Sequence, residues 1–290
     1  MPEEVAGSGA GVYCDWMTMW IDEFAAGWLA QLDDAAHALD DGWALYLLLD
    51  GVFAPGLHRR FSAALGDESV ALLFETLPGC SDPVRDASPF VVRYAAGSRT
   101  MDGLLAQCSG RPMVSALETR EPLNALAARL AAWCVVENDG QRFNFRFADT
   151  RRLPGIVRAL DARQLGELAG PARRWHYVGR SGQWQALALP GDGHPVQERP
   201  QRLSDRQFGA MVDDSAADEM LVRLADRGVR HEGAPSVAHA LVSQALAAAD
   251  VAQLDARLRV DWCVECVRRG VRADEVRIMA ALETWRIAAA

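Results

Sequence analysis

Apolar residues fill positions 43–49 ("WALYLLL") without a polar interruption, and Asp50 and Gly51 follow directly. A short, continuous apolar run of this kind predicts a β-strand that is buried on both faces. Asp50 then stands at the carboxyl end of that strand. A carboxylate in this place can serve in catalysis, cap the amides of a turn, or take part in binding, and the pattern leaves these roles open.

Six further segments carry the apolar spacing of strands. In residues 142–149 ("RFNFRFAD") phenylalanine alternates with polar residues, which predicts a strand with one buried face. Residues 174–179 and 184–189 flank the turn formers of 180–182 and predict a hairpin. The remaining strands are expected at 69–75, 89–94 and 112–119.

Aromatic residues and leucine recur at about every fourth position in residues 15–39, which predicts a helix with one apolar face. This face is either part of the core or a surface that receives another chain. Shorter helices are expected at 55–65 and 121–136, each with a proline in its first turn. The apolar face of the first helix carries Trp16, Trp20, Phe24, Trp28 and Leu32.

Capping-box spacing marks two further helix starts, Asp161 with Gln164 and Ser204 with Gln207. From Leu203 onward the apolar spacing is helical throughout, with breaks at glycines. Helices are expected there at 204–227, 234–249, 251–269 and 273–287.

These elements divide the chain into two lobes. Residues 12–190 are expected to form a mixed α/β lobe with a central sheet, and residues 204–290 an all-helical lobe. The stretch between them, residues 191–203, is rich in proline and glycine and predicts a linker. The fold class is therefore α+β or α/β.

Composition narrows the functional classes. The 290 residues carry a net charge of −9, which argues against nonspecific nucleic-acid binding. All basic residues are arginine, a residue suited to bidentate pairing with carboxylates. No apolar run approaches the roughly 20 residues that span a bilayer, and no secretion signal opens the sequence, so we expect a cytoplasmic protein with reduced cysteines.

Two groups of residues are candidates for chemistry. Asp149 also ends a predicted strand, so Asp50 and Asp149 together could serve a small-molecule hydrolase. Cys263 and Cys266 have the spacing of a thiol-redox motif but lie inside a predicted helix, where they are expected to be core residues; redox activity would require an exposed thiol of low pKa. The sequence shows no metal or cofactor motif, and we expect neither.

Five blocks occur in a characteristic order: "LYLLLDGVFAPGL", "ALLFETLPG", "SPFVVRY", "FNFRFADTRRLPGIVRAL", and "LAGPARRWHYV" with "GQWQAL". Together they resemble the bacterial type VI secretion effector-adaptor family, whose members are also called effector chaperones. The resemblance runs from about residue 16 to residue 190, and the helical tail is also typical of the family. Two positions depart from its pattern: Thr150 replaces the proline that usually follows the acid, and Ser88 replaces a glycine.

The resemblance implies a cytoplasmic adaptor without catalysis. Such a protein binds a toxic effector and promotes its loading onto the VgrG spike for toxin delivery. It implies an α/β lobe and a helical lobe that hold an effector segment in the cleft between them. Nucleic acid, membrane insertion and cofactors have no place in that function.

We place the partner-binding residues in the matching blocks, with the arginines pairing to carboxylates or carbonyls of a partner. The net charge and the tryptophan-rich helix suggest a partner segment that is hydrophobic with basic flanks. The predicted partner-binding residues are Asp50, Phe53, Arg146, Phe147, Asp149, Arg151, Arg152 and Trp175.

Overall fold

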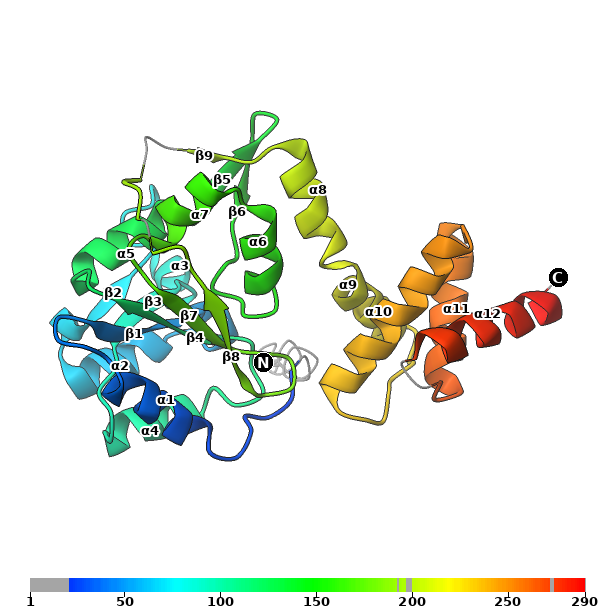
Figure 1. Cartoon of the computed structure of the whole chain (residues 1–290), viewed down its shortest axis with the longest axis horizontal. Helices are drawn as coiled ribbons and strands as arrows, with labels where there is room; N and C mark the ends of the chain where they lie inside the picture. Colours follow the sequence, from blue (N-terminus) through cyan, green and yellow to red (C-terminus); the bar gives the residue numbers. More distant parts are fainter. Residues whose placement is uncertain (1–20, 192, 197–199, 272–273, 290) are drawn as a thin grey trace, which may run out of the picture.

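The computed structural model describes residues 21–191, 193–196, 200–271 and 274–289. A sheet-containing part and a helical part lie beside each other, joined through helices α8 and α9 (Figure 1). No helix of the described residues is long and apolar enough to span a membrane. The two parts correspond to the mixed lobe with a central sheet and the helical lobe that the sequence predicts.

A six-stranded sheet forms the centre of the first part. Every pair of neighbouring strands in it is antiparallel, so the fold is α+β. The strands in spatial order are β2 (Val70–Leu72), β3 (Phe90–Arg93), β1 (Ala44–Leu49), β4 (Val114–Thr119), β7 (Arg174–Val178) and β8 (Trp184–Ala188).

The sheet is covered on both faces, which explains the uninterrupted apolar run in β1. Leu45, Leu47 and Leu49 point into one core, and Tyr46 and Leu48 into the other. The first core includes side chains from α1 (Trp28–His37), α2 (Leu57–Leu65) and α4 (Arg99–Ala106). The second includes side chains from α5 (Leu123–Ala131), α6 (Leu153–Ala159) and α7 (Ala162–Ala169).

A small second sheet corrects two predictions. The helix expected at 121–136 ends at Ala131, and the strand expected at 142–149 ends at Asn144. Residues 135–144 form a hairpin that turns at Asp139 and Gly140, whose φ angles are 47° and 72°. The chain then turns again after Asn144, where the Phe147 amide donates to the Phe145 carbonyl and the Asp149 amide to the Arg146 carbonyl. The sheet contains β5 (Val135–Asn138), β6 (Gln141–Asn144) and β9 (Gln201–Arg202), and β9 lies inside the stretch expected to be linker.

The first predicted helix also begins later than expected. Residues 21–27 are not helical because their backbone bonds elsewhere: the amides of Asp22 and Ala25 donate to the carbonyls of Arg180 and Gly182. Helix α1 starts at Trp28, and Trp28 and Leu32 are buried in the core. The predicted helical residues 15–20, with Trp16 and Trp20, lie outside the described residues.

The helix expected at 204–227 breaks at Asp214 and Ser215. Its first half, α8 (Asp205–Asp213), packs on the first part through Phe208 and Met211. Its second half, α9, belongs to a separate core that includes Trp262. The helices around that core are α9 (Ala216–Asp226), α10 (Pro235–Val251), α11 (Ala256–Arg268) and α12 (Glu275–Ala289).

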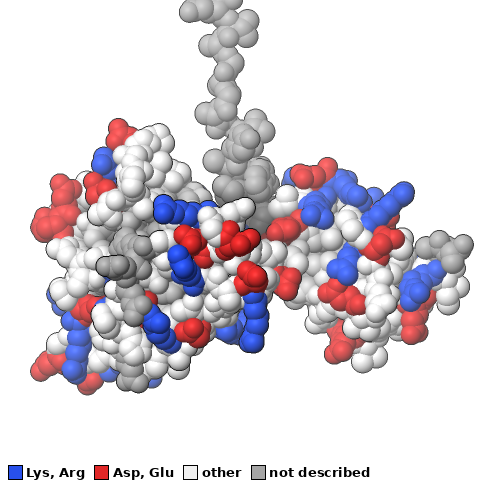
Figure 2. Space-filling model, turned by 90° about the horizontal axis from the view of Figure 1, so that it is seen from above, with Lys and Arg blue, Asp and Glu red and all other residues white. Residues whose placement is uncertain are grey.

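Charged side chains of both signs are interspersed over the face of the molecule shown in Figure 2. Red and blue atoms alternate on the sheet-containing part and on the helical part alike, so this face has no extended single-sign patch. A net charge of −9 therefore does not translate into a uniformly acidic surface there.

Candidate functional site

Asp50 is a buried cap that also forms an ion pair. Its Oδ1 accepts a hydrogen bond of 3.1 Å from the Val52 amide, at the short helical turn η1 (Gly51–Phe53). Its Oδ2 lies 2.7 Å from the Arg146 guanidinium. Burial raises the pKa of Asp50, and the charge of Arg146 opposes that rise. Gly51 is required because a Cβ there would collide with the Ser88 carbonyl.

The loop after β6 brings the two predicted acids to one guanidinium. Arg146 pairs with Asp50 and also lies 3.8 Å from Asp149. Asp149 receives two hydrogen bonds from the Arg151 guanidinium, at 3.0 and 2.7 Å, in a bidentate arrangement. The guanidinium carbons of Arg146 and Arg151 lie 5.4 and 5.5 Å from the centre of the Phe53 ring. The predicted residues Asp50, Phe53, Arg146, Asp149 and Arg151 therefore form one cluster.

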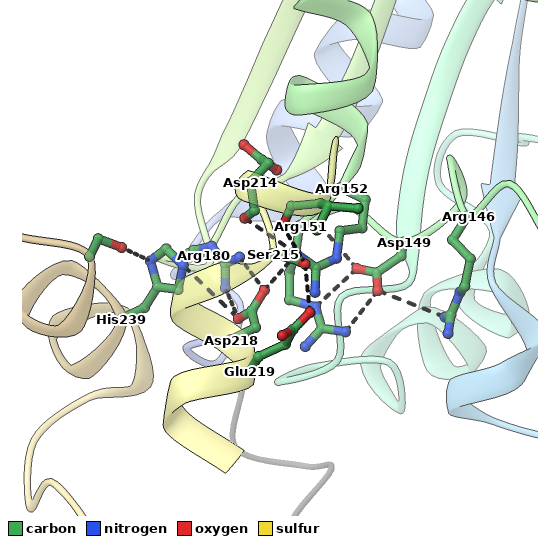
Figure 3. A network of polar contacts seen from close by, with 12 residues as sticks. Arg146, Asp149, Arg151, Arg152, Arg180, Asp214, Ser215, Asp218, Glu219 and His239 are labelled. Atoms are coloured by element: carbon green, nitrogen blue, oxygen red, sulfur yellow. Dashed lines mark hydrogen bonds and ion pairs between the residues drawn. The ribbon is translucent and has the colours of Figure 1, made fainter. Parts of the chain in front are cut away.

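A third buried acid, Asp218 of α9, joins this cluster to the helical part (Figure 3). Its carboxylate accepts two hydrogen bonds of 2.9 Å from Arg180 and lies 3.0 Å from Arg152. His239 of α10 approaches it to 4.0 Å. Burial alone would raise the pKa of Asp218, but the hydrogen bond and charge of Arg180, together with the charges of Arg151 and Arg152, lower it. Arg152 and Arg180 thereby hold the helical part against the sheet-containing part.

A pocket of about 340 Å³ opens beside this network, between the β5–β6 hairpin, α6 and α8. Part of its lining is apolar, and Phe143 and Phe208 meet there with ring centres 4.6 Å apart. Its lining also contains charged residues, four of which are predicted site residues: Arg146, Asp149, Arg151 and Arg152. The pocket also reaches Asp214 and Ser215, where α8 gives way to α9.

Two predicted binding residues lie in the core, and the prediction is corrected for them. Phe147 and Trp175 are buried, and their rings pack edge to face with centres 6.2 Å apart. The Trp175 indole N–H donates to the Ser115 hydroxyl, so its polar atom is satisfied inside the protein. Neither side chain can contact a partner unless the core repacks. A large apolar residue in a sequence is as typical of the core as it is of a binding surface.

The structure gives no support to thiol chemistry at Cys263 and Cys266. Both side chains are buried in the core of the helical part. Burial raises the pKa of both thiols, that of Cys263 to about 12. The pair is therefore a pair of core residues on α11. Among the described residues, no three acids, histidines or cysteines are grouped in a way that could hold a metal ion.

The arrangement is suited to binding more than to proton transfer. The oxygens of Asp50 and Asp149 are engaged by guanidinium and backbone donors, which leaves them poorly placed to take a proton from a substrate. The Arg146 side chain is 36% exposed and can donate further hydrogen bonds. Apolar lining residues beside such a donor fit a side chain and its adjoining main-chain carbonyl.

Several residues of the site belong to no sequence motif that would have marked them as site residues. Asp218 and Arg180 belong to segments predicted only as a helix and a hairpin turn. Phe208 and Met211 carried the helical spacing of α8, which predicts that they are buried but not what they pack against. Folding alone brings these residues beside the loop of Arg146.

Residues 45–167 match the model of a protein family described as a domain of unknown function (DUF4123). That family is associated with effector adaptors of type VI secretion systems. The matched segment runs from β1 through α7 and so contains Asp50, Asp149 and the three pocket arginines, but not Asp218. No curated protein and no solved structure matches the chain significantly.

Proposed function

We propose that this protein is a cytoplasmic adaptor that binds a type VI secretion effector and promotes its loading onto the VgrG spike, without catalysis. The observation that carries the proposal is the pocket lined by apolar side chains and three arginines, most of which is formed by the segment that matches the DUF4123 model. Small concave sites with a few fixed polar groups anchor side chains of a bound partner.

The charged residues of the pocket change the chemistry expected of the effector segment. Three arginines and two aspartates line the pocket, and Asp149 is already held by Arg151. Arg146 has the most exposed side chain of the three arginines, so the site favours apolar anchor residues with carbonyl or carboxylate neighbours over basic flanks. We therefore do not propose basic flanks for the effector segment, although the net charge suggested them.

Co-expression with the products of the neighbouring genes tests the proposal. An effector or spike protein should co-purify with the wild-type chain, and the soluble yield of the effector should rise. Val212 lines the pocket and is 50% exposed, so Val212→Glu should weaken effector binding without harming the fold. Loss of an apolar contact and insertion of a charge at an anchor site predict a decrease of about tenfold or more.

Val237→Glu is the matched control, because Val237 is 49% exposed and lies on α10, outside the pocket. It should bind effector as the wild type does. Equal losses in the two variants would reject the pocket as the site. A wild-type chain that binds neither neighbouring product would reject the adaptor function itself.

A hydrolase that uses Asp50 and Asp149 is the alternative, and one observation favours it. Arg146 brings both carboxylates to one place, and burial raises the pKa of Asp50, as in many general acids. Asp50→Asn distinguishes the two functions. A turnover activity that disappears in a folded Asp50→Asn variant would support the enzyme.

A further inference from the structure

We infer that the outer edge of β8 is a second docking site, which takes an extended segment of a partner protein as an added strand with a carboxylate facing Arg174. The inference rests on the proposed adaptor function for the identity of the partners. The site lies on the central sheet, while the pocket is formed by the second sheet, α6 and α8.

One side of the β8 backbone has no partner among the described residues. On its other side β8 pairs with β7, and the flanking bonds from Gly179 N–H to the Gln183 carbonyl and from Leu189 N–H to the Arg173 carbonyl fix which residues face β7. By alternation, the N–H and C=O groups of Trp184, Ala186 and Ala188 point outward. No group of the described residues bonds to them. This row of donors and acceptors is what an extended main chain recognises.

The edge lacks the features that normally prevent strand addition. Residues 184–188 ("WQALA") contain no charge and no proline, and Ala186 and Ala188 are exposed. The opposite edge strand, β2, has only three residues, and β6, an edge strand of the second sheet, carries the exposed Arg142. Of these three edges, β8 is the one that is long, uncharged and unpaired within the part of the chain that the structure describes.

The strand is also held rigidly, which lowers the entropic cost of binding. The Trp184 indole N–H donates to the Trp28 carbonyl at 2.9 Å. The hairpin turn at Gly182 has a φ of 70° and packs against the backbone of residues 23–25. The Ala25 amide donates to the Gly182 carbonyl at 2.9 Å. The edge is therefore preformed in the free protein.

Charge complementarity indicates the partner's chemistry. Arg174 lies directly across from Ala188 on the same face of the sheet, and its side chain is 61% exposed. Its nearest acid, Glu118, lies 3.9 Å away and is already engaged at 2.6 Å by Arg173 and by His176. A residue opposite Ala188 on an added strand would stand about 10 Å from Arg174, with only a methyl group between them. Glutamate or aspartate at that position would pair with Arg174 across the alanine.

Hydrogen exchange on the complex of the full chain with the co-expressed effector or spike protein is the direct test. The amides of Trp184, Ala186 and Ala188 should gain protection when the partner binds. Ala186→Pro removes one outward donor and leaves the bonds to β7 in place, so it should weaken binding about tenfold. Ala186→Thr keeps the donor and the strand preference and should bind within about twofold of wild type.

Arg174→Glu should also weaken binding, and an acid-to-arginine change in the paired partner residue should restore it. Two results would overturn the inference and leave the adaptor function standing. One is a complex that forms without protection of the three amides, and the other is a folded Ala186→Pro variant that binds the partner normally. Failure of the wild type to bind either protein would overturn both. A concentration-dependent dimer of the chain alone that Ala186→Pro abolishes would assign the edge to a second copy and refute the partner assignment.

Discussion

Replacement of Asp218 by asparagine should loosen the contact between the two parts of the molecule. The change keeps the shape of the side chain but leaves the guanidiniums of Arg152 and Arg180 facing a neutral amide. These side chains are 21% and 20% exposed, while Asp218 is 2% exposed. Removing one partner of a buried ion pair costs about 3–5 kcal/mol, and partial hydration of the arginines reduces this to about 2–3 kcal/mol.

The loss of stability caused by Asp218→Asn should be confined to the contact between the two parts, because each part has its own core. Residues of α9–α12 form their own apolar cluster, and α8 packs with the sheet-containing part. Asp22 provides a second polar link, since its carboxylate accepts hydrogen bonds from the amide and the hydroxyl of Ser236 on α10. We therefore expect Asp218→Asn to increase amide exchange around the α9 and α10 starts and to raise the radius of gyration measured by small-angle scattering.

The pH dependence of this effect has a definite sign. The pKa of Asp218 in the folded protein lies below its unfolded value of 3.8, so the carboxylate stabilises the fold fully above that pH. The difference in unfolding free energy between Asp218→Asn and wild type should therefore be constant near neutral pH and shrink as the pH falls below 3.8.

Glu219→Gln is the matched control, because Glu219 is exposed in the same first turn of α9 and loses the same charge. It should cost no more than about 0.5 kcal/mol, the usual value for an exposed acid near a helix start. Equal effects of the two substitutions on stability and on amide exchange would refute the role of Asp218 in joining the two parts.

The remaining predictions concern Asp50, which caps η1, and His239 of α10. Asp50→Ala should lower the free energy of unfolding by about 1–3 kcal/mol in urea denaturation, because the Val52 amide and Arg146 lose their acceptor; a variant as stable as wild type would contradict this. Burial, reinforced by Arg180, lowers the pKa of His239 to about 4 from 6.5, so the fold should lose about 1–2 kcal/mol as the pH falls from 6.5 toward 4. His239→Gln should remove that slope in pH-dependent denaturation, and an unchanged slope would exclude His239 as its source.

Elements set by local signals could be predicted from the sequence. The apolar run of residues 43–49 is a strand buried on both faces, and both predicted capping boxes, Asp161 with Gln164 and Ser204 with Gln207, are present at helix starts. The hairpin of β7 and β8 also lies where its turn residues predicted. These patterns work because helix caps, turns and side-chain periodicity involve residues only a few positions apart.

Predictions failed where a distant contact competes with the local pattern. Residues 21–27 have the spacing of a helix but bond to the hairpin turn about 158 residues later, with the Asp22 amide on the Arg180 carbonyl. Phe147 and Trp175 stand in motif positions that suggested binding, yet the fold buries both in the same core, Trp175 from β7 and Phe147 from the loop after β6.

The sequence by itself determined the strands of the central sheet, the two capped helix starts, the helical character of the second part and the residue types available for binding. Only the tertiary structure decided that Arg146 bridges Asp50 and Asp149, that Arg152 leaves this cluster to meet Asp218, and that α8 closes a pocket beside them. The physical reason is that an ion pair depends on where the fold places its two charges. With 30 arginines in the chain, no local pattern specifies which of them meets a given acid.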